Sequence, residues 1–307
     1  MLQTILGSTG IIGTEIAKSL PQYTEHIRLV SRNPKQVNPY DEILQADLLD
    51  AEQTIKAVEG SEVVYLTPGL QYNIKIWREQ WPQIMQNTIE ACKRAGAKLV
   101  FFDNVYMYGR VDGWMTEESP YKPVSRKGEV RAQIAKMLMK EAEKGNLQAL
   151  IARSADFYGP NAGTGVGNVL VIDNYMKGKK AQWMGDVNKK HSFTYTADAG
   201  KATALLGNTE SAFNQEWLLP TAKDTLTGKE FIELAAKLAE VDPKYMILKK
   251  SMLRMAGLFN GLIRELAEMY YQYQFDYLFD SSKFEKSFDF QATSYKDGIE
   301  ECIKALE

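Results

Sequence analysis

The sequence predicts an α/β protein with a doubly wound parallel sheet, and three observations support this fold class. Short apolar runs alternate with longer amphipathic segments through the first half of the chain. A glycine-rich loop follows the first apolar run, and the alternating rhythm ends after residue 155. Strands and helices that alternate make right-handed crossovers, which cover both faces of a parallel sheet with helices.

The apolar runs place each element along the chain. We expect strands at 2–6, 27–31, 42–46, 62–67, 98–103 and 147–152, with helices at 11–20, 51–58, 74–95 and 126–144. Later segments predict strands at 191–195 and 216–219, and helices from 197 and near 228–240, 252–274 and 294–306. We therefore expect a dinucleotide-binding domain at 1–160, to which 191–219 returns, and a smaller, mostly helical substrate lobe at 161–190 and 220–307.

Composition limits the classes of function. The chain has 307 residues and a formal net charge of -2, so no excess of one sign predicts a nucleic-acid or membrane-surface partner. Two cysteines and two histidines are too few for a disulfide framework or a His- or Cys-rich metal site. No charged leader precedes the first strand, and no apolar run reaches the ~18 residues that span a bilayer. We expect a cytoplasmic protein that binds no metal, nucleic acid or membrane.

The loop "TILGSTGIIGTEIA" has glycines at positions 7, 10 and 13. In this context Gly7 allows a tight turn, Gly10 lets a pyrophosphate approach the backbone, and Gly13 lets the helix pack closely on the strand. The start of the helix adds N–H donors and a partial positive charge. The alternative is a tight turn with only a structural role.

The second strand ends in "LVSRNP", where NAD-binding sites place an acidic residue. Ser31, Arg32 and Asn33 stand there instead. An acid repels the 2′-phosphate of NADP, whereas an arginine binds it, so this segment favours NADP over NAD. The alternative is that Arg32 is an exposed loop cation. Asp47 and Leu48, after the third strand, are expected near the adenine ring.

Several segments together resemble one family in order and spacing. They are "GSTGIIG", "ADL" at 46–48, "NTIEACKRAGAKLVFFD" at 87–103, "MYG" at 107–109, "RSADFYGP" at 153–160, "FTYTAD" at 193–198 and "DSSKFEKSFDF" near the end. The chain resembles the extended short-chain dehydrogenases/reductases of the sugar epimerase/dehydratase type. The resemblance implies a Rossmann-type fold and further NAD(P) contacts from Ser8, Thr9, Ile11, Ile12, Thr67, Pro68, Lys127 and Phe157.

The resemblance also implies a catalytic Ser-Tyr-Lys triad, which this chain lacks. Asn104 stands in the serine position, and Lys127 and Arg131 replace the Tyr and Lys that follow Pro123. We expect Lys127 and Arg131 to face the cofactor, although charges four residues apart most often mark a solvated helix face. Tyr106 is a further catalytic candidate, with core packing as its alternative.

Three other positions bear on this resemblance. Literal Y-x-x-x-K matches begin at Tyr175 and Tyr245, and we attribute both to chance. His191 replaces an arginine that contributes to diphosphate binding in sugar-nucleotide members, which weakens the nucleotide-sugar interpretation. A pocket residue and a hydrogen-bonded structural residue are both open for His191. Asp198 matches a buried acid of the family with a structural role.

Two functions remain open. The first is an NADP-dependent oxidoreductase or epimerase-like enzyme that acts on a small molecule with a non-standard acid/base set. The second is a catalytically silent NADP-binding redox sensor or regulatory protein, since the triad is missing. The helices at 74–95 and 126–144 are those through which many relatives form a homodimer, so a dimer is possible here as well.

Overall fold

The structure is a computed structural model that describes residues 1–307. Contacts within the chain divide it into two units: 1–107, 126–154 and 199–219 form the first, and 108–125, 155–198 and 220–307 form the second. These boundaries differ from our expectation, because 108–125, 155–160 and 191–198 belong to the second unit. None of the helices combines the length and the apolar character that crossing a membrane requires.

The first unit is built on a parallel sheet of seven strands in the order β11-β7-β5-β4-β1-β2-β3. The strands are β1 (Leu2–Leu6), β2 (His26–Ser31), β3 (Glu42–Gln45), β4 (Val63–Leu66), β5 (Lys98–Asp103), β7 (Ala149–Arg153) and β11 (Glu216–Leu218). All residues of β4 and β7 are buried, as expected for strands covered on both faces. The predicted fold class is confirmed, and each of the seven strands of this sheet lies within two residues of its predicted bounds. The eighth predicted strand, at 191–195, lies in the second unit.

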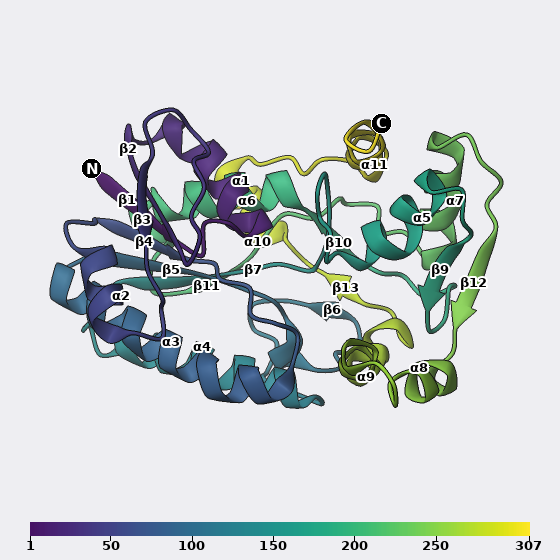
Figure 1. Ribbon diagram of the computed structural model, residues 1–307, viewed down its shortest axis with the longest axis horizontal. Helices are drawn as coiled ribbons and strands as arrows, with labels where there is room; N and C mark the ends of the chain where they lie inside the picture. The colour runs from purple at the N-terminus through teal and green to yellow at the C-terminus, as the bar shows by residue number, and fades with distance from the viewer. The chain divides into compact units, whose positions relative to one another are not determined.

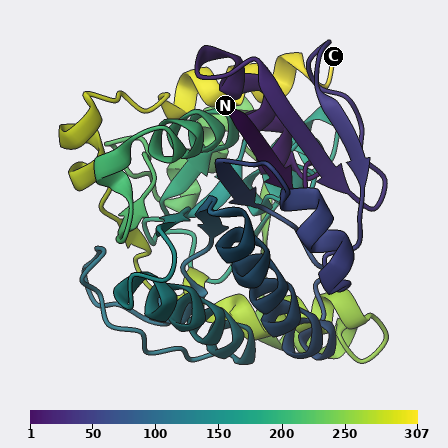
Figure 2. The ribbon, with the colours of Figure 1, turned by 90° about the vertical axis from the view of Figure 1, so that its left-hand side faces the viewer.

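Helices cover both faces of this sheet (Figure 1). On one face lie α1 (Ile11–Ser19) and α6 (Thr196–Gly207), and on the other lie α2 (Ala51–Val58), α3 (Ile74–Ala95) and α4 (Arg126–Glu143). Figure 2 shows α3 packed between α2 and α4. The side chains of Asp50 and Asn73 accept backbone N–H groups at the starts of α2 and α3, and Gly96 ends α3 with a positive φ.

The chain runs outward from β1 in both directions, with β2 and β3 on one side and β4, β5, β7 and β11 on the other. Such a change of direction leaves a crevice at the carboxyl ends of the strands beside it. The carboxyl ends of β1, β2 and β4 are therefore where this fold positions a ligand.

The second unit contains three short parallel pairs of strands. They are β6 (Trp114–Met115) with β13 (Leu278–Phe279), β8 (Asp156–Tyr158) with β10 (Phe193–Tyr195), and β9 (Ala181–Met184) with β12 (Tyr245–Leu248). Its helical elements are η3 (Gly167–Ile172), α5 (Asp173–Met176), α7 (Gly228–Leu238), α8 (Lys250–Ala256), α9 (Gly261–Glu268), η5 (Met269–Tyr273), α10 (Ser282–Phe288) and α11 (Tyr295–Lys304).

The prediction of a single helix at 252–274 is wrong, because α8, α9 and η5 occupy this segment. Gly257 ends α8, and the side chain of Asn260 accepts the N–H groups of Leu262 and Ile263 to start α9. Asparagine competes with the helical backbone for hydrogen bonds, so it favours a new helix start over a continuous helix.

Candidate functional site

The glycine loop at the end of β1 is a compact turn that tolerates no side chain at two of its positions. Gly7 has a φ of +90°, and a Cβ there would lie 2.5 Å from the backbone nitrogen of Pro68. A Cβ on Gly13 would lie 2.8 Å from the carbonyl oxygen of Gly7. Gly10 has more room, since its nearest neighbour would be 3.4 Å away. The backbone at Gly10 is therefore the part of the loop that a ligand can approach.

A cavity of about 340 Å³ opens beside this loop. It is lined by Gly7, Thr9, Gly10, Ser31, Arg32, Asn33, Ala46, Asp47, Leu48, Leu49, Pro68, Gly69, Leu70, Gln80 and Ile84. The lining thus comes from the ends of β1, β2, β3 and β4 and from two positions one turn apart on α3. All of these residues belong to the first unit.

The polar groups of the loop fit a dinucleotide. The hydroxyl of Ser8 is buried and makes no hydrogen bond within the chain. The N-terminus of α1 is capped by Gly10 without any side-chain hydrogen bond, so its backbone donors are not used by a side chain. Donors left unused at a helix N-terminus beside a glycine turn suit a diphosphate.

The structure brings together nine of the residues that we predicted for the cofactor. Gly7, Thr9, Gly10, Ser31, Arg32, Asn33, Asp47, Leu48 and Pro68 all line the cavity. Ser8, Ile11, Ile12 and Gly13 belong to the same loop and helix start, and the Thr67 hydroxyl instead donates to the Leu6 carbonyl across 3.0 Å. Phe157 lies in β8 of the second unit. Gln80 and Ile84 were missed, although their i,i+4 spacing on one helix face was a readable signal.

The segment after β2 leaves a cation exposed at the cavity. Arg32 is exposed, and no hydrogen bond or ion pair engages its guanidinium. Asp47 also lines the cavity, but its Oδ1 accepts the backbone N–H of Leu49 at 3.0 Å. The Asp47 carboxylate therefore stabilises the turn after β3. The end of β2 presents only neutral and positively charged side chains to the cavity.

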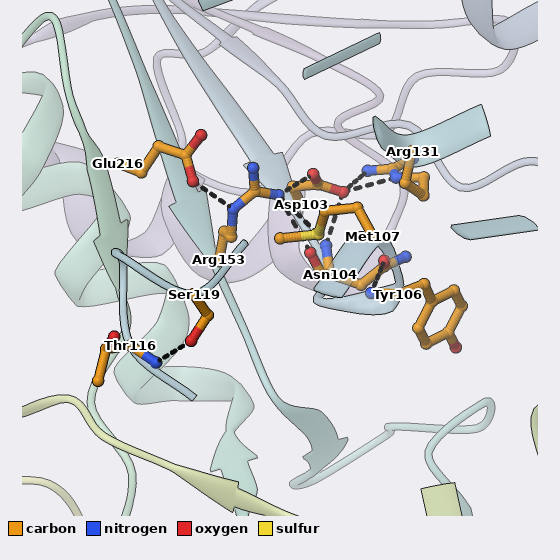
Figure 3. A network of polar contacts seen from close by, with 9 residues as sticks. All are labelled: Asp103, Asn104, Tyr106, Met107, Thr116, Ser119, Arg131, Arg153 and Glu216. Atoms are coloured by element: carbon orange, nitrogen blue, oxygen red, sulfur yellow. Dashed lines mark hydrogen bonds and ion pairs between the residues drawn. The ribbon is translucent and has the colours of Figure 1, made fainter. Parts of the chain in front are cut away.

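The end of β5 carries a buried network of charges (Figure 3). Asp103 forms ion pairs with Arg131 of α4 and with Arg153 of β7, and all three side chains are buried. The Nε of Arg131 lies 2.5 Å from Oδ1 of Asp103, and the Nε of Arg153 lies 2.9 Å from Oε2 of Glu216. Two carboxylates therefore balance two guanidinium groups within this network.

Arg131 is not a surface residue. Its guanidinium carbon lies 4.3 Å from the ring centre of Trp81 and 5.0 Å from that of Phe101. Burial lowers the pKa of Arg131, and the neighbouring Asp103 opposes that shift. The solvated-face interpretation of Lys127 and Arg131 is wrong, because both side chains are buried. The expectation that they face the cofactor stays a prediction.

Lys127 lies beside a group of aromatic rings at the start of α4. Its Nζ is 4.6 Å from the ring centre of Tyr72, whose ring meets that of Trp77 edge-on at 5.6 Å. Trp77 in turn stacks on Tyr106 with an interplanar angle of 14°. We call Tyr72, Trp77 and Tyr106 the aromatic wall. Tyr72 and Tyr106 are only half-buried, so part of this wall is accessible.

The polar groups of Asn104 form hydrogen bonds within the turn that follows β5. Its side-chain Oδ1 accepts the backbone N–H of Tyr106 at 3.0 Å, and its own N–H donates to Oδ1 of Asp103 at 2.8 Å. The side chain in the serine position therefore supports the turn that presents Tyr106.

His191 is a buried structural residue of the second unit. Its ring stacks between Tyr273 and Tyr277, with centroid distances of 4.6 and 4.5 Å. Its Nε2 lies 3.0 Å from Oδ2 of Asp156, which also accepts the Tyr273 hydroxyl at 2.8 Å. Of the two interpretations left open for His191, the arrangement favours the hydrogen-bonded structural one.

The remaining sequence candidates also have structural partners. Asp198 accepts the backbone N–H and the hydroxyl of Thr293 at 2.6 and 3.0 Å. The hydroxyl of Tyr175 donates to the carbonyl of Lys244 at 3.3 Å, and Tyr245 lies in β12. These bonds agree with a structural role for Asp198 and with chance Y-x-x-x-K matches.

Comparison with known proteins finds one matching family model and two proteins of similar sequence. The family model described as "NAD dependent epimerase/dehydratase family" matches residues 4–216. The 3beta-hydroxysteroid-dehydrogenase/decarboxylase isoform 2 of Arabidopsis thaliana is 27% identical over 180 residues, which are 52% of this chain but only 29% of that protein. An uncharacterized UDP-glucose epimerase of Bacillus subtilis is 22% identical over 227 residues, covering 66% of this chain and 72% of the relative.

Among solved structures, the fold is similar to that of UDP-glucuronic acid 4-epimerase from Bacillus cereus in complex with NAD. The TM-score is 0.81 at 18% identity, over 100% of this chain and 98% of the other. At this identity the similarity supports the fold alone.

Proposed function

Because the chain belongs to the NAD dependent epimerase/dehydratase family, we propose that it is an NADP-dependent oxidoreductase or epimerase-like enzyme acting on a small molecule. The observation that carries the proposal is the cavity at the carboxyl ends of β1, β2 and β4. It combines an open glycine turn with the exposed cation of Arg32. The neighbouring loop residue Ser8 does not line the cavity, but its buried hydroxyl makes no hydrogen bond within the chain.

The cofactor is assigned to this cavity residue by residue. The backbone at Gly10 and the start of α1 hold the pyrophosphate, with Ser8 as an additional donor. Arg32 binds the 2′-phosphate, because no carboxylate at the end of β2 repels it. When bound, the nicotinamide supplies or accepts the hydride. The structural neighbour named above is in complex with NAD, so the preference for NADP rests on Arg32 alone.

The substrate side is assigned to the turn after β5 and the start of α4. Lys127 and Tyr106 are the catalytic candidates, because an ammonium group and a phenol can each donate a proton. Arg131 and Asn104 act as positioning residues, since Arg131 pairs with Asp103 and Asn104 holds the turn of Tyr106. The aromatic wall offers flat apolar faces to the substrate.

Calorimetric titration with NADPH and NADH tests the cofactor assignment. We expect tighter binding of NADPH, and a loss of about 1.5–3 kcal/mol for NADPH in Arg32→Ala through the missing charged hydrogen bond. Binding of NADH should stay unchanged. Lys35→Ala is the matched control, because Lys35 is an exposed cation of the same loop that does not line the cavity. Equal or tighter binding of NADH by the unaltered protein would contradict the proposal.

Oxidation of NADPH in a screen of carbonyl compounds tests the enzymatic part. Turnover that Tyr106→Phe or Lys127→Met reduces would support the assigned roles. Tight NADPH binding without turnover of any compound would instead indicate a regulatory cofactor-binding protein.

We further propose that the protein forms a homodimer through α3 and α4. These helices pack together, and ion pairs between Lys93 and Glu141 at 3.2 Å and between Arg78 and Glu129 at 3.5 Å join them. Sedimentation equilibrium tests the assembly, and a monomer at all concentrations would contradict it.

A further inference from the structure

The second unit carries a cluster of exposed apolar side chains on α8, α9 and the turn between them. We call this cluster the α8–α9 patch; it comprises Met252, Met255, Leu258, Phe259 and Leu262. Leu258 and Phe259, both in the turn, are 77% and 91% exposed. Exposed apolar residues that gather in one place mark interaction sites more often than single ones do.

α8 and α9 each pack through one face and expose their residues of the patch on the other. Leu253 of α8 and Glu265 of α9 are buried, so each helix is anchored by one face. Figure 1 shows α8 and α9 as neighbouring short helices, and they pack on each other. Because the inner faces are already packed, the outer side chains alone are available to a partner.

The surroundings of the patch are positively charged. Lys249, Lys250, Arg254 and Arg264 are exposed, and none of them forms an ion pair. No acidic residue occurs between Asp242 and Glu265, and Glu265 is buried. The patch therefore combines bulky apolar side chains at a protruding turn with uncompensated cations around it.

We propose that the α8–α9 patch docks on an anionic lipid surface. Short amphipathic helices with Phe and Leu on one face and Lys or Arg beside it lie in the interface of a bilayer, about 5–10 Å deep. The apolar side chains enter the acyl boundary and the four cations contact the headgroups. In this arrangement no helix has to span the bilayer, and none of the helices is long and apolar enough to do so.

A second copy of the chain is a poorer occupant. A twofold interface places the same patch on both partners, so it brings the four cations of each copy toward those of the other. Like charges at such an interface oppose association. An anionic surface removes this repulsion and attracts the same side chains.

The expectation of no membrane contact rested on the net charge of -2 and on the lack of a long apolar run. Neither observation detects a local cluster. The net charge of the whole chain includes acids elsewhere that offset the five cations between 243 and 264. The apolar residues of the patch form no long run, because Arg254, Gly257 and Asn260 interrupt them. The pattern becomes visible only when burial separates the inner from the outer face of each helix.

Flotation with lipid vesicles tests the proposal on the full chain. Vesicles of phosphatidylcholine mixed with phosphatidylglycerol should carry the protein upward, whereas vesicles of phosphatidylcholine alone should bind it weakly. Raising the salt toward about 1 M, where the Debye length falls to about 3 Å, should release a large part of the bound protein.

Two double variants separate the apolar and the charged contributions. Leu258→Ser with Phe259→Ser should reduce the partition coefficient at least tenfold, by about 1.4 kcal/mol or more. Lys250→Gln with Arg254→Gln should reduce it by about 25-fold, about fivefold for each charge. The controls are Tyr40→Ser, an equally exposed ring in the first unit, and Lys179→Gln with Lys180→Gln, two exposed cations away from the patch. Both controls should bind as the unaltered protein does.

Three results would overturn the proposal. The first is the absence of binding to the mixed vesicles. The second is binding that the two patch variants leave unchanged while their thermal unfolding shows an intact fold. The third is a dimer that Leu258→Ser with Phe259→Ser dissociates in the absence of any vesicle binding, which would assign the patch to a second copy.

Discussion

The carboxyl ends of β1 and β2 and the carboxyl end of β5 belong to the same edge of one sheet, but their polar side chains are used differently. Beside β1 and β2, the side chains of Ser8 and Arg32 make no hydrogen bond within the chain. At the end of β5, Asp103 binds two guanidinium groups and is fully enclosed. The side-chain donors beside β1 and β2 are available to a ligand. The arginine donors at the end of β5 instead form ion pairs with Asp103 within the fold.

This difference leads us to infer that a charged side chain expected at the cofactor can instead be paired within the fold. Arg131 stands where the resemblance implies a catalytic lysine, yet its charge is matched by Asp103 inside the protein. An arginine cannot act as a base at ordinary pH, so pairing it internally removes no acid/base function that it could have had. The contrast predicts opposite effects of mutations in the two regions, on stability at β5 and on ligand binding at β1 and β2.

The largest expected effect is that of Asp103→Asn on stability. The substitution leaves Arg131 and Arg153 buried without their shared carboxylate, and breaking a buried pair typically costs about 3–5 kcal/mol. Urea unfolding measures the change. Glu216→Gln is the milder control, because Glu216 is partly exposed and contacts only one of the two arginines. A loss below about 1 kcal/mol in Asp103→Asn would mean that the network contributes little to the fold.

The second effect concerns Gly10→Val and dinucleotide binding. The Cβ itself fits, 3.4 Å from the Gly7 carbonyl oxygen, but the branched methyl groups take the space that the phosphates need. We expect a loss of at least a hundredfold, about 2.7 kcal/mol, with an unchanged circular dichroism spectrum. Gly163→Val, at an open position of the second unit, controls for the added side chain. Full affinity in Gly10→Val would place the dinucleotide elsewhere.

A smaller effect is expected for Lys127→Met. The methionine keeps an unbranched apolar stem and removes the charge, so the apolar contacts of the buried stem are kept while the contact of the ammonium group with the Tyr72 ring is lost. Affinity for NADPH should fall about tenfold if the ammonium group reaches the cofactor. Lys140→Met removes an exposed charge from the same helix and should bind normally. Equal affinities of both variants would assign Lys127 to a packing role beside Tyr72.

The smallest expected effect compares two buried serine hydroxyls, one without a hydrogen bond and one with a partner. Ser8→Ala removes an unused hydroxyl, so stability should stay within about 0.5 kcal/mol while dinucleotide affinity falls about fivefold. Ser61→Ala should do the reverse, because the buried Ser61 hydroxyl lies 2.7 Å from that of Thr4. We expect it to lose about 1 kcal/mol of stability and no affinity. If both variants lose only stability, the Ser8 hydroxyl is not a ligand donor.

The sequence predicted the first unit well because its strands are short segments rich in apolar residues, such as VVYL in β4 and LVFF in β5, between longer amphipathic segments. It predicted a strand at 191–195, where β10 lies, but neither its partner β8 nor the pairs β6–β13 and β9–β12. The strands β6, β8 and β13 have only two or three residues and are too short to show a period. The helix at 252–274 was wrong because its apolar pattern continues through Gly257 and Asn260, where local capping ends and restarts the helix.

The cavity was predictable because the glycine loop and the segments at the ends of the first strands are local patterns. The charge network was not predictable in the same way. Asp103 pairs with Arg153 fifty residues later, and Arg153 with Glu216 sixty-three residues later. Pairing over such separations leaves no spacing rule in the sequence. The only available signal was that two neighbouring buried strands each end in a charged residue of opposite sign.

The strand order also sets how the protein can be assembled during its synthesis. β2 and β3 join β1 on one side, and β4, β5, β7 and β11 then add in turn on the other. Each strand that leaves the ribosome thus meets a finished edge, and no strand has to insert between two others. Arg131 emerges before Arg153, and Glu216 follows both. In a chain that folds as it is synthesised, Asp103 would therefore pair first with Arg131 and then with Arg153, and Arg153 with Glu216 last.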